Sequence, residues 1–199
     1  MRSREIVKTA AFDANGRPFG LLPIGMFPTD LMRLPGLGNH AKYRTFLWLL
    51  ARQLPSPKVM VELGTDTGVT AAFLSSGKNP DDRLISVDID TSLRIVFNEL
   101  AEFIKADSLD FLRDYSGELV SLFFLDTDHT YERVSQEYRL VKPLLAPGGI
   151  VCVDDILLNE GMRRFWDEVR EEKLDLSELH TQLQAPHLPR GTGFGVIFP

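Results

Sequence analysis

The sequence predicts an α/β fold in which a mostly parallel sheet carries helices on both faces, and three observations lead to this prediction. From residue 41 onward, short apolar segments alternate with longer amphipathic ones. The apolar segments hold few polar residues, which is typical of strands buried on both faces. The strand and helix units repeat at a length that favours parallel strands joined by helical crossovers.

The first 40 residues lie outside this alternation. Gly and Pro occupy eight positions within residues 1–37 and interrupt any periodic pattern. The apolar residues between them are too many for a solvated tail. We therefore expect residues 1–40 to form an arm that packs on the core or on a partner subunit. Residues 41–199 are expected to form one domain.

Each element of the domain has its own signal. A helix is predicted over 41–53 because Phe46, Leu47 and Leu50 share one face, and Pro55 follows its end. The other predicted helices have amphipathic patterns and cover 69–75, 91–102, 109–115, 131–145 and 161–173. The predicted strands are apolar runs bounded by turn residues and cover 59–63, 84–88, 103–105, 120–126, 150–154, 178–184 and 195–198.

The composition narrows the classes of function. The net charge of −6 argues against a nucleic-acid backbone or an anionic membrane as the partner. Cys152 is the only cysteine, so an internal disulfide and a zinc–cysteine site are excluded. The first residues have no long apolar core of the kind found in signal peptides. We expect a cytoplasmic protein.

Residues 58–70, which read K-V-M-V-E-L-G-T-D-T-G-V-T, predict a strand, a glycine turn and a helix N-terminus. Glycine allows a close approach of the backbone to a ligand, and the first N–H groups of a helix attract anions. Glu62, near the end of the strand, would repel a phosphate. The same carboxylate suits a ligand that carries an ammonium group or ribose hydroxyls.

Four predicted strands end in an acid, at Glu62, Asp88, Asp126 and Asp154. In a parallel sheet, ligands bind beyond the carboxyl ends of the strands. Carboxylates gathered there repel one another and favour a cation or a hydroxyl-rich ligand. Asp88 stands where dinucleotide-type folds bind ribose hydroxyls, although an acid at this position could also simply cap a turn or helix.

The ordered segments V-E-L-G-T-D-T-G-V-T, S-V-D-I-D, A-D-S, F-L-D-T-D-H and L-A-P-G-G-I-V-C-V-D-D resemble class I S-adenosylmethionine-dependent methyltransferases. Within that class, residues 41–199 look most like the metal-dependent small-molecule O-methyltransferases and the cephalosporin-hydroxylase-type group. The resemblance implies a Rossmann-like methyltransferase fold, with a seven-stranded sheet whose last strand is antiparallel. The family often has an aromatic residue where Asp66 stands.

The resemblance also implies roles for single residues. The methionine part of S-adenosylmethionine would be surrounded by Glu62, Gly64, Thr65, Gly68 and Thr70. Asp88 would bind the ribose hydroxyls, and Asp107 with Ser108 would lie beside the adenine. Asp126 is expected to border the cofactor as well.

Asp126, Asp154 and Asp155 fall where the metal-dependent enzymes place their metal ligands. Three oxygen ligands suit Mg²⁺, or Mn²⁺ or Ca²⁺, which would orient a substrate hydroxyl and lower its pKa. The alternative is that these acids cap helices and bind water. His129 stands where related enzymes often carry a catalytic lysine. We expect it to accept the hydroxyl proton, and the alternative is a capping role.

The leading hypothesis is an S-adenosylmethionine-dependent O-methyltransferase that acts on a small hydroxylated molecule, and the arm favours a homodimer. A non-catalytic protein that keeps the fold and the cofactor pocket is the main alternative. A nicotinamide-dependent oxidoreductase is disfavoured, because the turn G-T-D-T-G lacks the G-x-G-x-x-G spacing.

Overall fold

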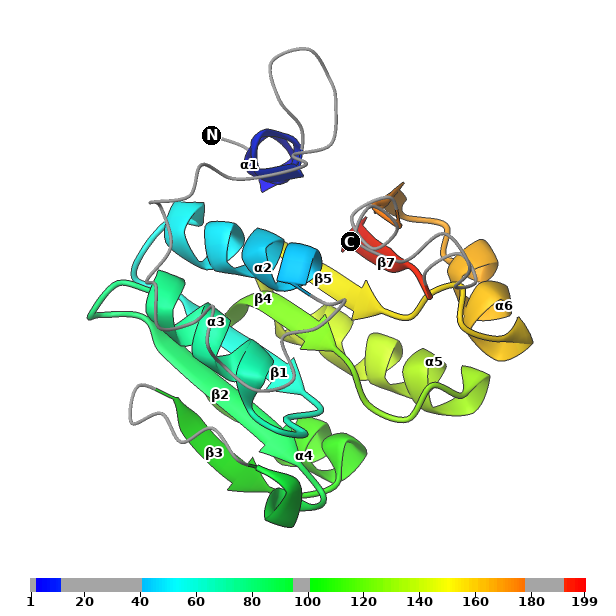
Figure 1. Ribbon diagram of the computed structural model, residues 1–199, viewed down its shortest axis with the longest axis horizontal. Helices are drawn as coiled ribbons and strands as arrows, with labels where there is room; N and C mark the ends of the chain where they lie inside the picture. Colours follow the sequence, from blue (N-terminus) through cyan, green and yellow to red (C-terminus); the bar gives the residue numbers. More distant parts are fainter. Residues whose placement is uncertain (1–2, 12–40, 95–100, 178–191) are drawn as a thin grey trace.

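The computed structural model describes residues 3–11, 41–94, 101–177 and 192–199. Seven strands form one sheet in the order β3-β2-β1-β4-β5-β7-β6 (Figure 1). The strands are β1 (Val59–Leu63), β2 (Arg83–Asp88), β3 (Glu102–Lys105), β4 (Val120–Leu125), β5 (Leu145–Asp154), β6 (Glu172–Asp175) and β7 (Phe194–Phe198).

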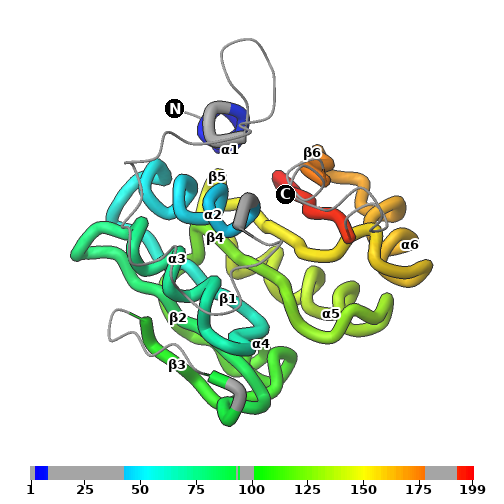
Figure 2. The backbone as a smooth tube through the Cα atoms, in the orientation of Figure 1, coloured from blue at the N-terminus to red at the C-terminus, as the bar shows by residue number. Residues whose placement is uncertain are grey.

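The first five strands run parallel, and β7 runs antiparallel to both of its neighbours. In the sheet, β7 lies between β5 and β6 although it is the last strand of the chain (Figure 2). The mostly parallel α/β sheet and its antiparallel final strand are confirmed.

Helices cover both faces of the sheet. The helices are α1 (Ser3–Ala11), α2 (Ala41–Gln53), α3 (Val69–Gly77), α4 (Ser108–Asp114), α5 (Tyr131–Val141) and α6 (Glu160–Glu168), with two 3₁₀ turns, η3 (Thr91–Leu93) and η4 (Lys142–Leu144). One core cluster joins α1, α2 and α3 to the sheet, and a second joins α4, α5 and α6 to its other face. Within the described ranges, no helix is long and apolar enough to span a membrane.

The central strand β4 shows why the apolar runs fold in this way. Phe124 packs in the cluster under α2 and α3, whereas Phe123 and Leu125 pack in the cluster under α5 and α6. All three are buried. Because successive side chains of a strand point to opposite faces, a strand covered on both sides needs an apolar residue at every position.

Several predicted boundaries were wrong. Residues 3–11 form α1, whose Ile6 and Val7 are buried, where an irregular segment was predicted. Such a short helix needs only a narrow apolar stripe, which is hard to recognise in a sequence. The predicted turn at 147–149 lies inside β5, at a shift in its register with β4.

The C-terminal part also departs from the prediction. Helix α6 ends at Glu168, and the predicted helical residues 172 and 173 belong to β6. Lys173 reaches back from β6, and its Nζ donates to the carbonyl oxygen of Val169 at 3.0 Å, which satisfies the end of the helix. The charged residues of β6 suit an edge strand. The strand predicted over 178–184 lies outside the described residues. So do most of the arm and residues 95–100, which are half of the predicted helix 91–102. The described part of that helix forms the 3₁₀ turn η3 at its start, and its last residue begins β3.

Candidate functional site

The glycine turn after β1 is shaped by the neighbouring strand. Gly64 has φ +98°, and a Cβ at this position would lie 1.9 Å from the backbone oxygen of Asp126. The N–H of Asp126 donates to the carbonyl of Leu63 at 2.8 Å, and the N–H of Gly64 donates to the carbonyl of Val87 at 2.8 Å. Gly64 is therefore required for the close approach of β1 to β4. Gly68, with φ +82°, precedes the first turn of α3.

Glu62 lies inside the protein at the end of β1. It shares a face of the sheet with Met60, two residues earlier, so its side chain lies on the face that α2 and α3 cover. One carboxylate oxygen, Oε2, accepts a hydrogen bond from Ser86, which also bonds Thr65 at 2.7 Å. The other, Oε1, is buried and has no hydrogen-bond partner within the described residues. Burial raises the pKa of Glu62 to about 8.

Thr70, in the first turn of α3, is held by a residue that the sequence analysis did not single out. Arg44 of α2 is buried, and its Nε donates to the Thr70 hydroxyl at 3.0 Å. Tyr43 beside it is also buried and stacks on Phe194, with the ring centroids 5.4 Å apart. Burial, and then the charge of Asp154, raise the pKa of Tyr43 well above its ordinary value. The sequence offered no clear signal for Arg44, because α2 also carries Lys42 and Arg52 and burial cannot be read from the helix alone.

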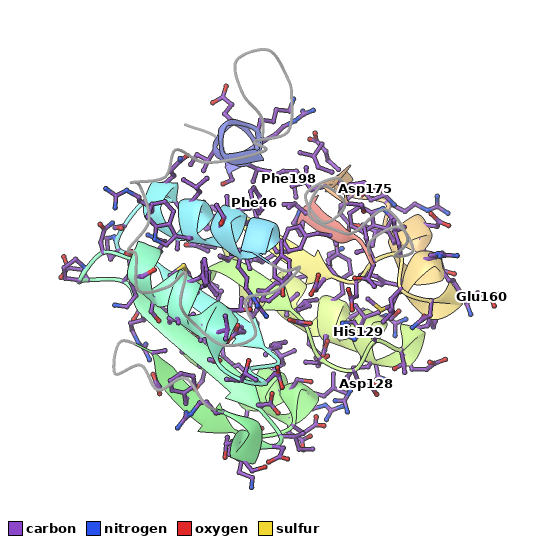
Figure 3. The ribbon with its side chains drawn as sticks, in the orientation of Figure 1. Phe46, Asp128, His129, Glu160, Asp175 and Phe198 are labelled. Atoms are coloured by element: carbon purple, nitrogen blue, oxygen red, sulfur yellow. The ribbon has the colours of Figure 1, made fainter. Side chains whose placement is uncertain are left out.

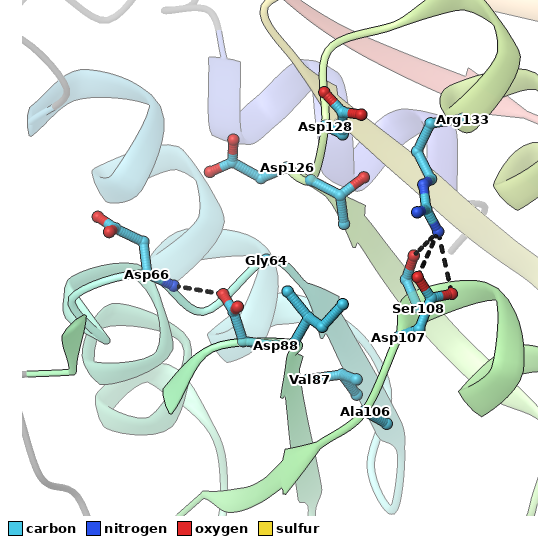
Figure 4. A pocket seen from close by; sticks show the side chains of 12 residues that line it. Gly64, Asp66, Val87, Asp88, Ala106, Asp107, Ser108, Asp126, Asp128 and Arg133 are labelled. Carbon is cyan, nitrogen blue, oxygen red and sulfur yellow. Dashed lines mark hydrogen bonds and ion pairs between the residues drawn. The ribbon is translucent and has the colours of Figure 1, made fainter. Parts of the chain in front are cut away.

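Asp88 ends β2 at the rim of a pocket of about 270 Å³ (Figure 4). Its Oδ2 accepts from the N–H of Asp66 at 2.9 Å, and its Oδ1 accepts from the N–H of Asp90 at 2.9 Å. Asp66 has φ +43°, a left-handed conformation that is uncommon for a residue other than glycine. The turn that departs from the family pattern thus positions Asp88 through its own backbone.

Asp107 and Ser108 line the same pocket, but other residues already bind their side chains. Asp107 caps α4 by accepting from the N–H of Leu109 at 2.8 Å, and it accepts from Arg133 at 2.9 and 3.0 Å. Burial opposes ionisation of Asp107, but these bonds outweigh it and lower the pKa. Ser108 donates to the buried Glu137 of α5. Figure 4 shows Arg133 reaching across to both residues.

The acids after β4 and β5 gather around a histidine. His129, in the loop between β4 and α5 (Figure 3), has its Nε2 3.5 Å from Asp126 Oδ1 and 3.4 Å from Asp155 Oδ2. Burial, and then the charge of Asp154, raise the pKa of Asp126. Burial alone would lower the pKa of His129, but the nearby aspartates raise it above its ordinary value.

The predicted residues therefore meet at one end of the sheet, as two groups. Glu62, Gly64, Thr65, Gly68 and Thr70 surround the glycine turn, and Asp88, Asp107 and Ser108 line the pocket beside it. Asp126 borders both the pocket and the His129 cluster. Across residues 3–11, 41–94, 101–177 and 192–199, no three His, Cys, Asp or Glu side chains are arranged to hold a metal ion. His40, His180 and His187 lie outside those ranges.

Comparisons with known proteins identify the domain. Residues 61–156 match the family model described as a methyltransferase domain. No curated protein matched the sequence.

Solved structures share the fold over most of the chain. The O-methyltransferase TomG from Streptomyces achromogenes, solved with S-adenosylmethionine, is 21% identical over 98% of this chain and 89% of its own, with a TM-score of 0.62. An O-methyltransferase from Bacillus cereus, solved with S-adenosylhomocysteine, is 18% identical over 99% and 90%, with a TM-score of 0.57. The Podospora anserina methyltransferase PaMTH1, also bound to S-adenosylhomocysteine, is 15% identical over 84% and 83%, with a TM-score of 0.58.

At these identities the structural neighbours establish the fold, and the family model adds the type of domain. Both agree with the ordered motifs of the sequence. Residues 61–156 therefore form a methyltransferase domain, and the chain shares its fold with solved S-adenosylmethionine-dependent methyltransferases.

Proposed function

We propose that the protein transfers the methyl group of S-adenosylmethionine to a hydroxyl group of a small molecule. The observation that carries this proposal is the buried Glu62, whose Oε1 has no hydrogen-bond partner within the described chain, next to a helix N-terminus. A buried carboxylate with an unpartnered oxygen fits a cationic ligand, because a charge inside a protein needs a partner of opposite charge. The cofactor's methionine ammonium would supply that partner.

Asp88 and the pocket beside it suit the nucleoside part of the cofactor. Each carboxylate oxygen of Asp88 accepts one backbone N–H and keeps capacity for a ribose hydroxyl. Val87, Ile89 and Ala106 line the pocket and offer apolar surface to the adenine. Because Asp107 and Ser108 are bound to Arg133 and Glu137, we propose that they shape the pocket through this network.

His129 is the proposed general base. In its neutral form the imidazole would accept the proton of the acceptor hydroxyl as the oxygen attacks the methyl carbon. The bond from that carbon to sulfur breaks, its electron pair stays on sulfur, and S-adenosylhomocysteine leaves. Asp126 and Asp155, about 3.5 Å away, would stabilise the imidazolium that forms. The hydroxyl substrate is inferred from this proton acceptor and from the O-methyltransferases that share the fold.

The predicted divalent cation stays a separate prediction. Three carboxylates in one cluster have the donor chemistry of a Mg²⁺ site. Their placement does not fit a ligand set, since His129 Nε2 lies between Asp126 and Asp155 and no three side chains are arranged for a metal in the described parts of the chain. We therefore write the reaction without a metal step.

Titration calorimetry with S-adenosylmethionine, followed by a methyl-transfer assay on a panel of phenols, catechols and sugars, tests the proposal. We expect one cofactor per chain and transfer to at least one hydroxyl compound. His129→Ala should reduce turnover with little change in cofactor affinity. No heat and no thermal shift at millimolar cofactor would refute the proposal, and binding without any transfer would favour the non-catalytic alternative.

The same assay addresses the cation. Activity that disappears with a chelator and returns with Mg²⁺ would establish a metal role for Asp126, Asp154 and Asp155. Activity that chelation leaves unchanged would remove it.

A further inference from the structure

The loop between β5 and α6, residues 155–159, contacts His129 at two points. Asp155 lies with its Oδ2 3.4 Å from the Nε2 of the imidazole. Four residues later, the side-chain amide of Asn159 donates from Nδ2 to the backbone carbonyl of His129 at 2.8 Å. One short segment therefore contacts the histidine both at its ring and at its backbone.

The amide of Asn159 is already ordered by a second hydrogen bond. Asn159 is the N-cap of α6, and its Oδ1 accepts from the N–H of Met162 at 2.9 Å. Because only the amide oxygen can accept this bond, the NH₂ group must face His129. An exposed polar contact usually costs the conformational entropy of its side chain. The cap has already fixed Asn159, so the contact with His129 needs little further ordering.

The start of α6 also lies close to the start of α5 (Figure 1). A Cβ added at Gly161 would lie 3.1 Å from the backbone nitrogen of Tyr131. The Tyr131 hydroxyl donates to Glu168 at 2.6 Å, and the guanidinium carbon of Arg164 lies 3.9 Å from the centre of the Tyr131 ring. Tyr131 is only two residues after His129, so α6 holds the chain on both sides of the bond from Asn159.

The other end of the loop between β4 and α5 is anchored separately. Thr127 lines the pocket beside Asp88, and its hydroxyl donates to the buried Glu137 of α5 at 2.8 Å. This bond does not depend on α6. Loss of the bond from Asn159 would therefore loosen His129 and leave the cofactor end of the loop in place.

From these contacts we propose that Asn159 is a positioning residue for methyl transfer. Its amide holds the backbone of His129, so that the imidazole faces the acceptor hydroxyl in a fixed orientation. Asn159 acts through His129 and not on the reacting atoms. This inference rests on the proposed function, since it concerns the proposed general base of the same site.

Asn159→Ser and Asn159→Asp separate this role from helix capping. Serine and aspartate are good N-cap residues, so both variants should keep α6 and the midpoint of urea denaturation. Neither can hold the His129 carbonyl while it caps the helix, because the serine hydroxyl is one atom shorter and a carboxylate has no N–H.

Turnover is measured with saturating S-adenosylmethionine and the phenol, catechol or sugar that the panel identifies as acceptor. We expect kcat to fall about tenfold or more in both variants, because a small misplacement of a catalytic group is costly. The Kd of S-adenosylmethionine, measured by calorimetry, should not change. The two variants differ in charge, so an equal fall in kcat assigns the effect to the lost hydrogen bond.

The matched controls are Asn79→Ser and Asn79→Asp. Asn79 is exposed, lies in the turn that leads into β2, and donates from its side-chain amide to Ser56 at 2.6 Å. Both control variants should keep the kcat of the wild type. A second measurement needs no acceptor: the nuclear magnetic resonance signals of the His129 imidazole, identified by their absence in His129→Ala, should shift or broaden in both Asn159 variants and stay unchanged in the controls.

Unchanged kcat and unchanged His129 signals in Asn159→Ser would overturn the proposal. A fall in kcat in Asn159→Asp alone would also overturn it, since the added charge would then be the cause. Parallel losses of kcat, cofactor affinity and denaturation midpoint in both variants would show that Asn159 only supports packing. A wild-type protein that methylates no compound of the panel would refute the proposed function, and the His129 signals would still show whether Asn159 holds the histidine.

Discussion

Cofactor binding should release a proton from Glu62. Burial raises the pKa of this carboxyl from 4.5 to about 8, so at pH 7 about 0.9 of the molecules carry the proton before the ligand binds. A methionine ammonium placed beside the carboxylate favours its ionised form and lowers the pKa again. Binding at pH 7 should therefore release up to about 0.9 proton from Glu62. Affinity should rise as the pH increases toward 8, because the carboxyl must lose its proton.

Titration calorimetry in phosphate and in Tris measures this number, since the two buffers have different ionisation enthalpies. Glu62→Gln keeps the shape of the side chain and cannot titrate. The difference between wild type and variant measures the proton release from Glu62, together with any change that the Glu62 charge causes in its neighbour Asp126. Equal proton release from the two proteins, or proton uptake by the wild type alone, would refute the assignment of Glu62 to the ammonium group.

Two stability predictions follow from the packing. Gly64→Ala should destabilise the fold by about 4 kcal/mol or more, because its Cβ would meet a backbone oxygen at 1.9 Å. Gly148→Ala, with a similar positive φ but a nearest contact of 3.3 Å, should cost only about 1–3 kcal/mol of strain. Lys58→Met should cost about 3–5 kcal/mol, because it leaves Asp82 as an unpaired buried charge. Arg113→Met removes an exposed ion pair and should cost about 1 kcal/mol or less. Urea denaturation measures the free energy of unfolding of all four variants. Equal losses for the two glycine variants, or for the Lys58 and Arg113 variants, would contradict the packing argument.

Much of the fold could be predicted because the sheet is covered on both faces. That burial demands apolar runs, and the runs of β1, β2 and β4 were placed within a residue of their observed bounds. The strand-end acids could be predicted for the same reason, since a carboxylate after a buried run must lie at the carboxyl edge. The short edge strand β6 could not, because its E-K-L-D sequence is charged and is also compatible with a helix.

The contacts of the site were less accessible to sequence reasoning. The bond between Arg44 and Thr70 joins residues 26 positions apart on different helices, and no local pattern encodes it. The pairing of Asp107 with Arg133 likewise depends on how α4 packs against α5. Gly64 lines the pocket, and the backbone after β4 also packs against it, a contact that no local pattern encodes. Sequence spacing places residues at one edge of a sheet, but tertiary packing decides which of them touch.

A crystal structure with bound S-adenosylmethionine would test the central claim most directly. Our account predicts the methionine ammonium within hydrogen-bond distance, about 3 Å, of Glu62 Oε1. The ribose hydroxyls should lie on Asp88 and the adenine in the pocket beside it. A cofactor bound away from the glycine turn, with Glu62 still bonded only to Ser86, would contradict the account.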